Sequence, residues 1–280
     1  MVSPIVKDLF KIKKLDISLL VIFAILFTGL FGPLIYKRDP LAMRYPPERP
    51  PNRVNPLGTD SYGRDILAQL LCGIRTSIYI GVTAALIALS IGVVVGSIAG
   101  IKGGIIDNIL MAITDIVLVL PSVLLMMLIA AYFKYRSPML VSLIIGVTSW
   151  PWVARAIRSQ ILSLKSREFV YLSKMAGLSD LRIVIGDLLP NMAAYIFMAF
   201  VLLMSGAMMS EAGLSMIGIG VTRGVSLGIM LYWAQMLEAI RRGLWWWFIP
   251  PGLILVALAS SLLMISTALD EYFSPRLKER

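Results

Sequence analysis

The sequence predicts an all-α membrane protein with six transmembrane helices, and three observations lead to this fold class. Of the 280 residues, 58% are hydrophobic and only 15% are charged, whereas an average soluble domain carries about 25% charged residues. The mean hydropathy is +0.84. Apolar stretches near the length of about 20 residues that spans a bilayer recur along the chain. We therefore expect a single membrane domain.

Composition also excludes several kinds of site. The chain has no histidine, which removes histidine metal ligands and histidine acid–base catalysis. Its single cysteine, Cys72, cannot form an internal disulfide. We expect no catalytic residue, no metal site and no cofactor bound by this chain. The net charge of +10 fits basic loops beside anionic lipid headgroups, and no basic run suggests nucleic-acid binding.

The N-terminal part predicts a cytoplasmic start, one span and a long outer segment. Residues 1–16 are short and basic, and the apolar residues 17–36 provide about 30 Å of helix. No small-residue cleavage site follows, so we expect an uncleaved span with a cytoplasmic N-terminus. Residues 37–77 form a proline-rich extracytoplasmic segment, for which proline favours extended structure over a packed core.

Residues 78–269 are expected to hold the other five spans. The second, 78–101, carries Gly92, Gly96 and Gly100 on one helical face, a spacing that lets another helix approach closely. The sixth, 244–269, begins with three tryptophans, as an aromatic belt at the outer interface should. Residues 270–280 form a basic cytoplasmic tail.

The third, fourth and fifth spans are expected over 105–133, 139–157 and 191–212, with a second outer excursion over 213–243. A charge inside a span is costly, so it is usually functional or paired. Asp115 is such a charge, or alternatively it lies near the inner interface. The candidates for a translocation path or gate in these spans are Asp115, Pro121, Trp150 and Glu211.

The polar loop 159–190 is the segment around which the chain is organised. Its stretch 168–190 is too polar to cross a bilayer. Phe169, Leu172 and Ala176 recur at i, i+3 and i+7, which predicts one apolar stripe of a helix. Gly177 then breaks that helix.

A second short helix is expected after this break, at about 179–186. Ser179 can cap it, and Asp180 lies in its first turn, where the helix dipole favours negative charge. Pro190 ends the segment and can occupy the first turn of the next span.

This helix–glycine–helix form resembles the cytoplasmic "EAA" loop of ABC importer permeases, which docks on the ATPase subunit. The family pattern is Glu-Ala-Ala, three residues, Gly, nine residues, then Ile-x-Leu-Pro. Gly177, Leu189 and Pro190 match it, whereas 171–173 reads Tyr-Leu-Ser and Asp187 replaces the isoleucine. The resemblance implies an ATPase-coupling surface made by Glu168, Ala176, Gly177, Ser179, Asp180, Leu181, Arg182, Leu189 and Pro190.

A second and more specific resemblance covers residues 55–77. The permeases of dipeptide and oligopeptide importers carry a similar HPLGTDxxGRDxxSRLxxGxRxSL stretch. The matching residues here are Pro56, Leu57, Gly58, Thr59, Asp60, Gly63, Arg64, Asp65, Gly73, Arg75 and Ser77. Family-like runs also occur at 107–121 and 210–220, so the resemblance extends over nearly the whole chain.

The resemblance implies the type I ABC importer permease fold with a cytoplasmic coupling helix, and a C-type subunit that forms half of a path for di- and oligopeptides. The chain lacks a GxxxxGK[ST] loop, so ATP and Mg are expected on separate subunits. The implied partners are a B-type permease, one or two ATPases, an extracytoplasmic binding protein and membrane lipid. The implied location is the plasma or inner membrane, with both termini cytoplasmic.

Three alternatives remain open. The same architecture could import oligosaccharides. A secondary transporter would usually show repeated halves and broken helices around a midplane site, and no such repeat is visible. A membrane enzyme would need a nucleophile–base pair, and the sequence offers none.

Overall fold

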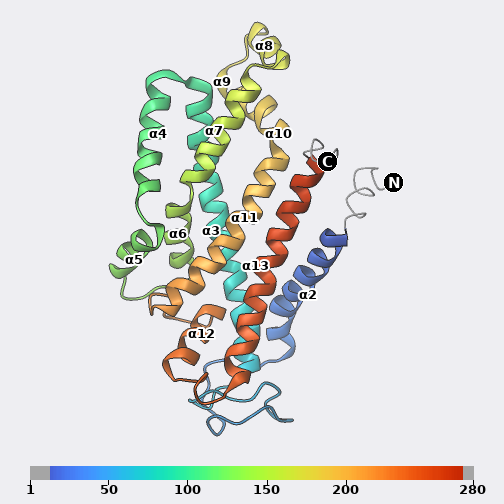
Figure 1. Ribbon diagram of the computed structural model, residues 1–280, viewed down its shortest axis with the longest axis vertical. Coiled ribbons are helices and arrows are strands. Elements are labelled where there is room, and N and C mark those ends of the chain that lie inside the picture. Colours follow the sequence, from blue (N-terminus) through green and yellow to red (C-terminus); the bar gives the residue numbers. More distant parts are fainter. Residues whose placement is uncertain (1–12, 274–280) are drawn as a thin grey trace.

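The computed structural model describes residues 13–273 and is built from helices (Figure 1). Over this range there is no strand, and the β-type pairing is an isolated bridge between Thr59 and Asp65. Four helices are long and apolar enough to cross a membrane: α2 (Lys13–Ile35), α3 (Ile66–Lys102), α11 (Ala193–Met216) and α13 (Trp245–Phe273).

Two bent helix pairs complete the membrane part. The first is α4 (Gly104–Val119) with α5 (Ser122–Ala131), bent by 85°, and the second is α6 (Pro138–Ser149) with α7 (Pro151–Lys165), bent by 47°. Counting each pair as one span gives six among the described residues. The predicted all-α membrane fold is therefore confirmed.

The central element is α3, a helix of 37 residues that is about 56 Å long at 1.5 Å per residue. It contacts α2, α4, α6, α7, α11, α13 and α12 (Leu227–Met236). Asp65 caps its start, because the carboxylate accepts a hydrogen bond from the backbone N–H of Ala68 at 2.9 Å. Gly103, with φ +67°, ends it.

The glycines of α3 lie directly against α7. A Cβ added at Gly92 would stand 2.7 Å from Cβ of Val153, and one at Gly96 would stand 2.5 Å from the carbonyl oxygen of Ala154. At Gly100 the nearest atom would be Cγ2 of Ile161, at 2.8 Å. The spacing of four residues therefore brings the two helices together as small residues do in membrane bundles.

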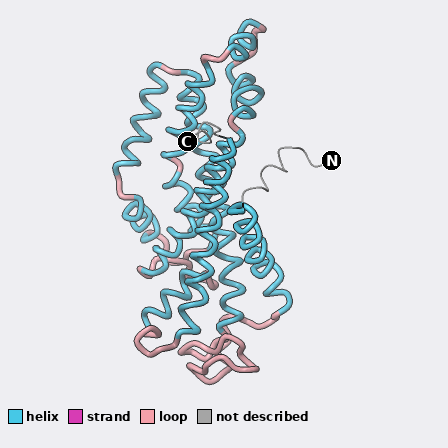
Figure 2. The backbone as a smooth tube through the Cα atoms, turned by 45° about the vertical axis from the view of Figure 1, so that its right-hand side comes forward, coloured by secondary structure: helices cyan, strands magenta, loops and turns pink. Residues whose placement is uncertain are grey.

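The two long polar segments lie at opposite ends of the bundle. Both views place α8 (Glu168–Met175) at one end, and the loops around residues 36–65 at the other (Figures 1 and 2). We call these the α8 end and the cap end. The first described turn of α2 and the last described turn of α13 are the ends of these two helices that lie farther from the cap end (Figure 1). The expected basic termini fall largely on 1–12 and 274–280, outside the described residues.

Several boundaries differ from those expected. Residues 66–77 belong to α3 and not to an outer segment, because the cap at Asp65 starts the helix early. The third span is broken at Leu120, whose ψ of 130° is extended as expected for a residue before proline. The fourth continues beyond residue 157 to Lys165, and the second excursion contains α12.

The cap, residues 36–65, is more ordered than its prolines predicted. The buried carboxylate of Asp65 accepts hydrogen bonds from Tyr36 Oη at 2.8 Å, Arg38 Nη1 at 2.9 Å and Asn55 Nδ2 at 2.7 Å. Partial burial, together with the bond to Asp65, raises the pKa of the Tyr36 phenol above its ordinary value. One acidic side chain therefore joins the end of α2, the cap and the start of α3.

Candidate functional site

The loop at the α8 end turns through a defined C-cap. The N–H of Gly177 donates to the carbonyl of Lys174 at 3.0 Å, and the N–H of Leu178 donates to the carbonyl of Ser173 at 3.1 Å. This pair of bonds is the Schellman motif, which needs a left-handed residue at its turn. Gly177 supplies it with φ +77°, as the sequence predicted.

After the turn the chain does not form one short α-helix. It runs through α9 (Asp180–Ile183), a π-helical turn η1 (Val184–Leu188) and α10 (Leu189–Asn191) before α11. Ser179 holds the N-cap position of α9, but its side chain makes no capping hydrogen bond. Pro190 lies within α10, directly before α11.

The buried side of the loop differs from the predicted stripe on α8. Val170 is fully buried, whereas Phe169 is half-buried and Leu172 is 67% exposed. The stripe was wrong because α8 contacts α7 and α9 only briefly, and Val170 is the side chain of α8 that becomes buried. The loop therefore carries exposed apolar side chains: Tyr171, Leu172, Met175, Leu178, Leu181 and Ile185. Leu181 and Ile185 also line a groove toward α3.

One hydrogen bond joins the two arms of the loop. Ser173 Oγ donates to Asp187 Oδ2 at 2.6 Å. Ser173 stands at the second alanine of the EAA pattern, and Asp187 stands at its isoleucine. The two departures from the pattern thus contact each other, and together they hold α8 against η1.

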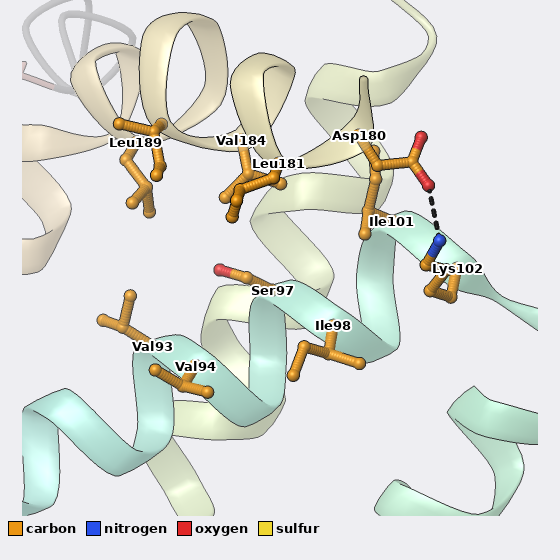
Figure 3. A pocket seen from close by; sticks show the side chains of 11 residues that line it. Val93, Val94, Ser97, Ile98, Ile101, Lys102, Asp180, Leu181, Val184 and Leu189 are labelled. Carbon is orange, nitrogen blue, oxygen red and sulfur yellow. Dashed lines mark ion pairs between the residues drawn. The ribbon is translucent and has the colours of Figure 1, made fainter.

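A groove of about 460 Å³ separates the second arm from the end of α3 (Figure 3). The side chains of Leu181, Val184 and Leu189 face those of Val93, Val94 and Ile98 across it (Figure 3). At its margin Lys102 Nζ lies 2.9 Å from Asp180 Oδ2. This hydrogen bond to Lys102 lowers the pKa of the Asp180 carboxyl, so the ion pair is present at neutral pH.

The remaining predicted coupling residues lie on the surface. Glu168 and Arg182 are exposed, and neither makes an ion pair within residues 13–273. Ala176 is the C-cap of α8 and is also exposed. The loop therefore presents apolar side chains, the acidic Glu168 and the basic Arg167, Lys174 and Arg182 to the surroundings of the α8 end.

Two ion pairs join α4 to α7 within the spans. Arg158 donates to Asp107 through Nη2 at 2.6 Å, and Arg155 Nε donates to Asp115 at 3.0 Å. The Asp115 side chain is 52% exposed, and it is paired as a charge in a span is expected to be. The sequence pointed to Asp115 as a charge within a span but not to its arginine partner or to the second pair, although the spacing of three residues between Arg155 and Arg158 matches one face of a helix.

The breaks in the third and fourth spans enclose a cavity of about 400 Å³ with α11. Pro121 lines it at the first break and Trp152 at the second, while Gly206 and Ser210 line it from α11. A second cavity of about 330 Å³ shares Met126 and Ser210 with the first. The other three residues predicted for a path or gate, Asp115, Trp150 and Glu211, do not line either cavity.

Glu211 instead joins α11 to α12. It is fully buried, and it accepts hydrogen bonds from Ser215 Oγ at 2.7 Å and Ser226 Oγ at 2.6 Å. Ser226 Oγ also caps α12 by accepting from the N–H of Ile229 at 3.1 Å. Through this network the carboxylate positions the helix that closes the cap end.

Comparison with known proteins shows which family and which proteins this chain is similar to. Residues 92–279 match the family described as "Binding-protein-dependent transport system inner membrane component". The oligopeptide transport system permease protein OppC of Bacillus subtilis is 32% identical over 265 residues, which cover 94% of this chain and 86% of the relative. The dipeptide transport system permease protein DppC of the same organism is 31% identical over 275 residues, with 96% and 84% covered.

A more distant organism gives the same result. The oligopeptide transport system permease protein OppC of Mycobacterium tuberculosis is 34% identical over 210 residues, which cover 74% of this chain and 71% of the relative. The alignments with the two Bacillus subtilis relatives each cover more than nine-tenths of this chain, so they include the loop at the α8 end and both cavities.

Proposed function

Because the chain belongs to the family of binding-protein-dependent transport system inner membrane components, we propose that it is a permease subunit of an ATP-driven importer of di- and oligopeptides. It is a multi-pass membrane protein. We place the α8 end in the cytoplasm, with both termini, and the cap end outside. The substrate class follows the relatives, which are named for oligopeptide and dipeptide transport.

The observation that carries the coupling role is the exposed apolar surface of the loop at the α8 end. Leu172, Met175 and Leu181 are 67%, 85% and 68% exposed on a segment held rigid by the glycine turn and the Ser173–Asp187 bond. An apolar surface on a fixed polar loop is typical of a protein interface. We assign it to a separate ATPase subunit, which would hold ATP and Mg.

The two cavities at the broken spans support a solute path. The cavity of about 400 Å³ is lined by the third, fourth and fifth spans, and the cavity of about 330 Å³ by the third and fifth spans and Ile217. Both volumes fall within the range of small-ligand sites. A second permease of the B type would complete the path, and an extracytoplasmic binding protein would deliver the solute to the cap end. The chain itself would not hydrolyse ATP.

The assembled complex in proteoliposomes tests this proposal. We expect the purified chain alone to show no ATP hydrolysis, and the complex to hydrolyse ATP faster with loaded binding protein. Leu181→Asp should reduce both co-purification of the ATPase and peptide uptake by tenfold or more, because it places a charge in an apolar contact. Leu181→Met, which keeps the surface apolar, should behave as the unmodified complex does.

The contrary results are distinct. Robust ATPase activity of this chain, free of other subunits, would contradict a non-catalytic role. Uptake that is unchanged by Leu181→Asp would contradict coupling through this loop. If the cognate binding protein retains an oligosaccharide and not a peptide, the proposed importer architecture stands, but the proposed substrate class is wrong.

A further inference from the structure

A third cavity of about 530 Å³ lies at the cap end, beside α12. Two loops form its walls, 132–137 and 217–226, and neither contains an acidic residue. Three arginines line it with two aromatic side chains and no carboxylate: Arg64, Arg136, Arg223, Tyr232 and Trp233. We call it the arginine cavity.

Arg136 is fixed in this cavity without a carboxylate partner. Its guanidinium donates to the carbonyl oxygens of Gly220 at 2.9 Å, Phe133 at 3.0 Å and Gly218 at 3.3 Å. The backbone N–H of Arg136 also donates to Thr222 Oγ1 at 2.7 Å. These bonds join the two loops and fix the guanidinium of Arg136. Carbonyl groups carry no net charge, so the positive charge of Arg136 is not neutralised.

Arg64 is only 8% exposed, and its guanidinium is half satisfied. Nε donates to Asp60 Oδ2 at 2.6 Å, whereas Nη2 is buried and has no hydrogen-bond partner within residues 13–273. Arg223 lies over the ring of Tyr135 at 5.0 Å and makes no ion pair in the described part of the chain. The lining thus holds three guanidinium groups, and Asp60, which pairs with Arg64 from outside the lining, is the carboxylate beside them.

The arginine cavity is next to the cavities at the broken spans. Ile217 lines the 330 Å³ cavity, and its neighbour Gly218 lines the arginine cavity. The 330 Å³ cavity in turn shares Met126 and Ser210 with the 400 Å³ cavity deeper in the bundle. The three cavities therefore follow one another along α11 from the cap end inward.

From this arrangement we propose that the arginine cavity binds the C-terminal carboxylate of a peptide solute at the entrance to the path. Guanidinium groups recognise carboxylates through paired, charge-assisted hydrogen bonds. Every unmodified peptide carries this group, so such a site accepts peptides of different sequence. The faces of Tyr232 and Trp233 can accommodate varied side chains beside it. This inference rests on the proposed function and names the solute group that the site takes.

Arg223 is the position to change, because it is exposed and holds no backbone carbonyl. The complex is assembled with Arg223→Gln and, as the matched control, Arg53→Gln, an exposed arginine of the cap away from this cavity. Uptake of trialanine and of trialanine amide is measured with binding protein saturated by each peptide. We expect Arg223→Gln to raise KM for trialanine about tenfold. The KM of Arg223→Gln for trialanine amide should stay unchanged. The KM values of Arg53→Gln for trialanine and for its amide should also stay unchanged.

A second readout does not depend on transport. Trp233 lines the cavity, so its fluorescence should change when trialanine binds there. Fluorescence is measured in the complex without binding protein, with and without the substitution Trp233→Phe. The part of the change that is lost in this variant reports occupancy of the cavity. We expect trialanine to produce this signal, the amide to produce much less, and Arg223→Gln to weaken it. Binding without uptake would refute the proposed function and leave the carboxylate site standing.

Three results would overturn the site itself. The first is an equal loss of uptake for trialanine and its amide in Arg223→Gln, which indicates a structural role. The second is the absence of a Trp233-dependent signal at saturating trialanine. The third is weaker association of the binding protein in Arg223→Gln regardless of its cargo, which would make the cavity a protein-docking contact.

Discussion

Single side chains join parts of this molecule that are distant in sequence. Asp65 holds the cap to α2 and α3, and Glu211 holds α12 to α11. Both acids belong to the family-like stretches that the sequence revealed, but their roles did not follow from it. A carboxylate in a motif gives no sign of whether it meets a solute or a neighbouring hydroxyl, because its partners come from other segments.

The contact between Ser173 and Asp187 shows the same limit inside the coupling loop. The sequence analysis identified both as departures from the EAA pattern. Nothing in the sequence indicated that they meet, because the glycine turn and the π-helical turn between them set the distance. The pair suggests that one departure compensates the other.

A substitution series tests this compensation. Ser173→Ala leaves the half-buried Asp187 carboxylate without its donor, which costs about 1–3 kcal/mol when a polar group is stranded. Adding Asp187→Ile, which restores the family residue, should remove most of that cost. Amide hydrogen exchange of the loop, measured in the complex, should show faster exchange in the single variant and near-normal exchange in the double variant.

Ser163→Ala is the matched control. Ser163 is exposed on α7, and its hydroxyl makes no hydrogen bond within residues 13–273. Strict additivity of the Ser173 and Asp187 effects would show that the two side chains are energetically independent. In that case the loop geometry would have to depend on the glycine turn alone.

At the scale of elements, the sequence predicted what depends on local chemistry. It predicted the break at Gly177 and the close packing of Gly92, Gly96 and Gly100, each from one residue type at a known position or spacing. It did not predict the 85° break before Pro121, because a proline inside a span is also compatible with a continuous helix. Nor did it predict η1, since a π-helical turn has no sequence pattern of its own.

Gly177 allows the sharpest test of an element. A Cβ at this position would meet no atom within 4 Å, so any effect of substitution comes from its φ of +77° and not from a clash. Gly177→Val should cost about 1–3 kcal/mol of local strain, because β-branched residues rarely adopt this conformation. We expect normal membrane insertion, with lost uptake and weakened ATPase association.

Gly177→Asn is the informative control, because asparagine tolerates the left-handed region far better than valine. It should retain most of the uptake. If both variants transport as well as the unmodified complex, the turn is a passive linker. If both fail equally, the surroundings of the loop in the complex need a residue without a side chain.

At the scale of the whole molecule, the fold separates two surfaces by the length of α3. The loop that contains α8, proposed as the coupling surface, occupies one end, and the cap with the arginine cavity occupies the other (Figure 1). The path cavities lie between them, at the places where two spans are broken. A movement of the loop at one end is therefore connected to the path through α7, which contacts α8, η1, α3 and α4.

This arrangement makes a topological prediction that needs no knowledge of the substrate. With Cys72 replaced by serine, a cysteine at Ser166 and a cysteine at Asn52 should be labelled from opposite sides of the membrane. Both positions are exposed, the first directly after α7 and the second in the cap. A membrane-impermeant maleimide added to intact cells should label Asn52→Cys alone, and lysis should reveal Ser166→Cys. Labelling of both from outside would refute the odd number of crossings between them, and would require that one bent helix pair turns back within the bilayer without crossing it. An uptake-competent complex in which only Ser166→Cys reacts before lysis would refute the orientation.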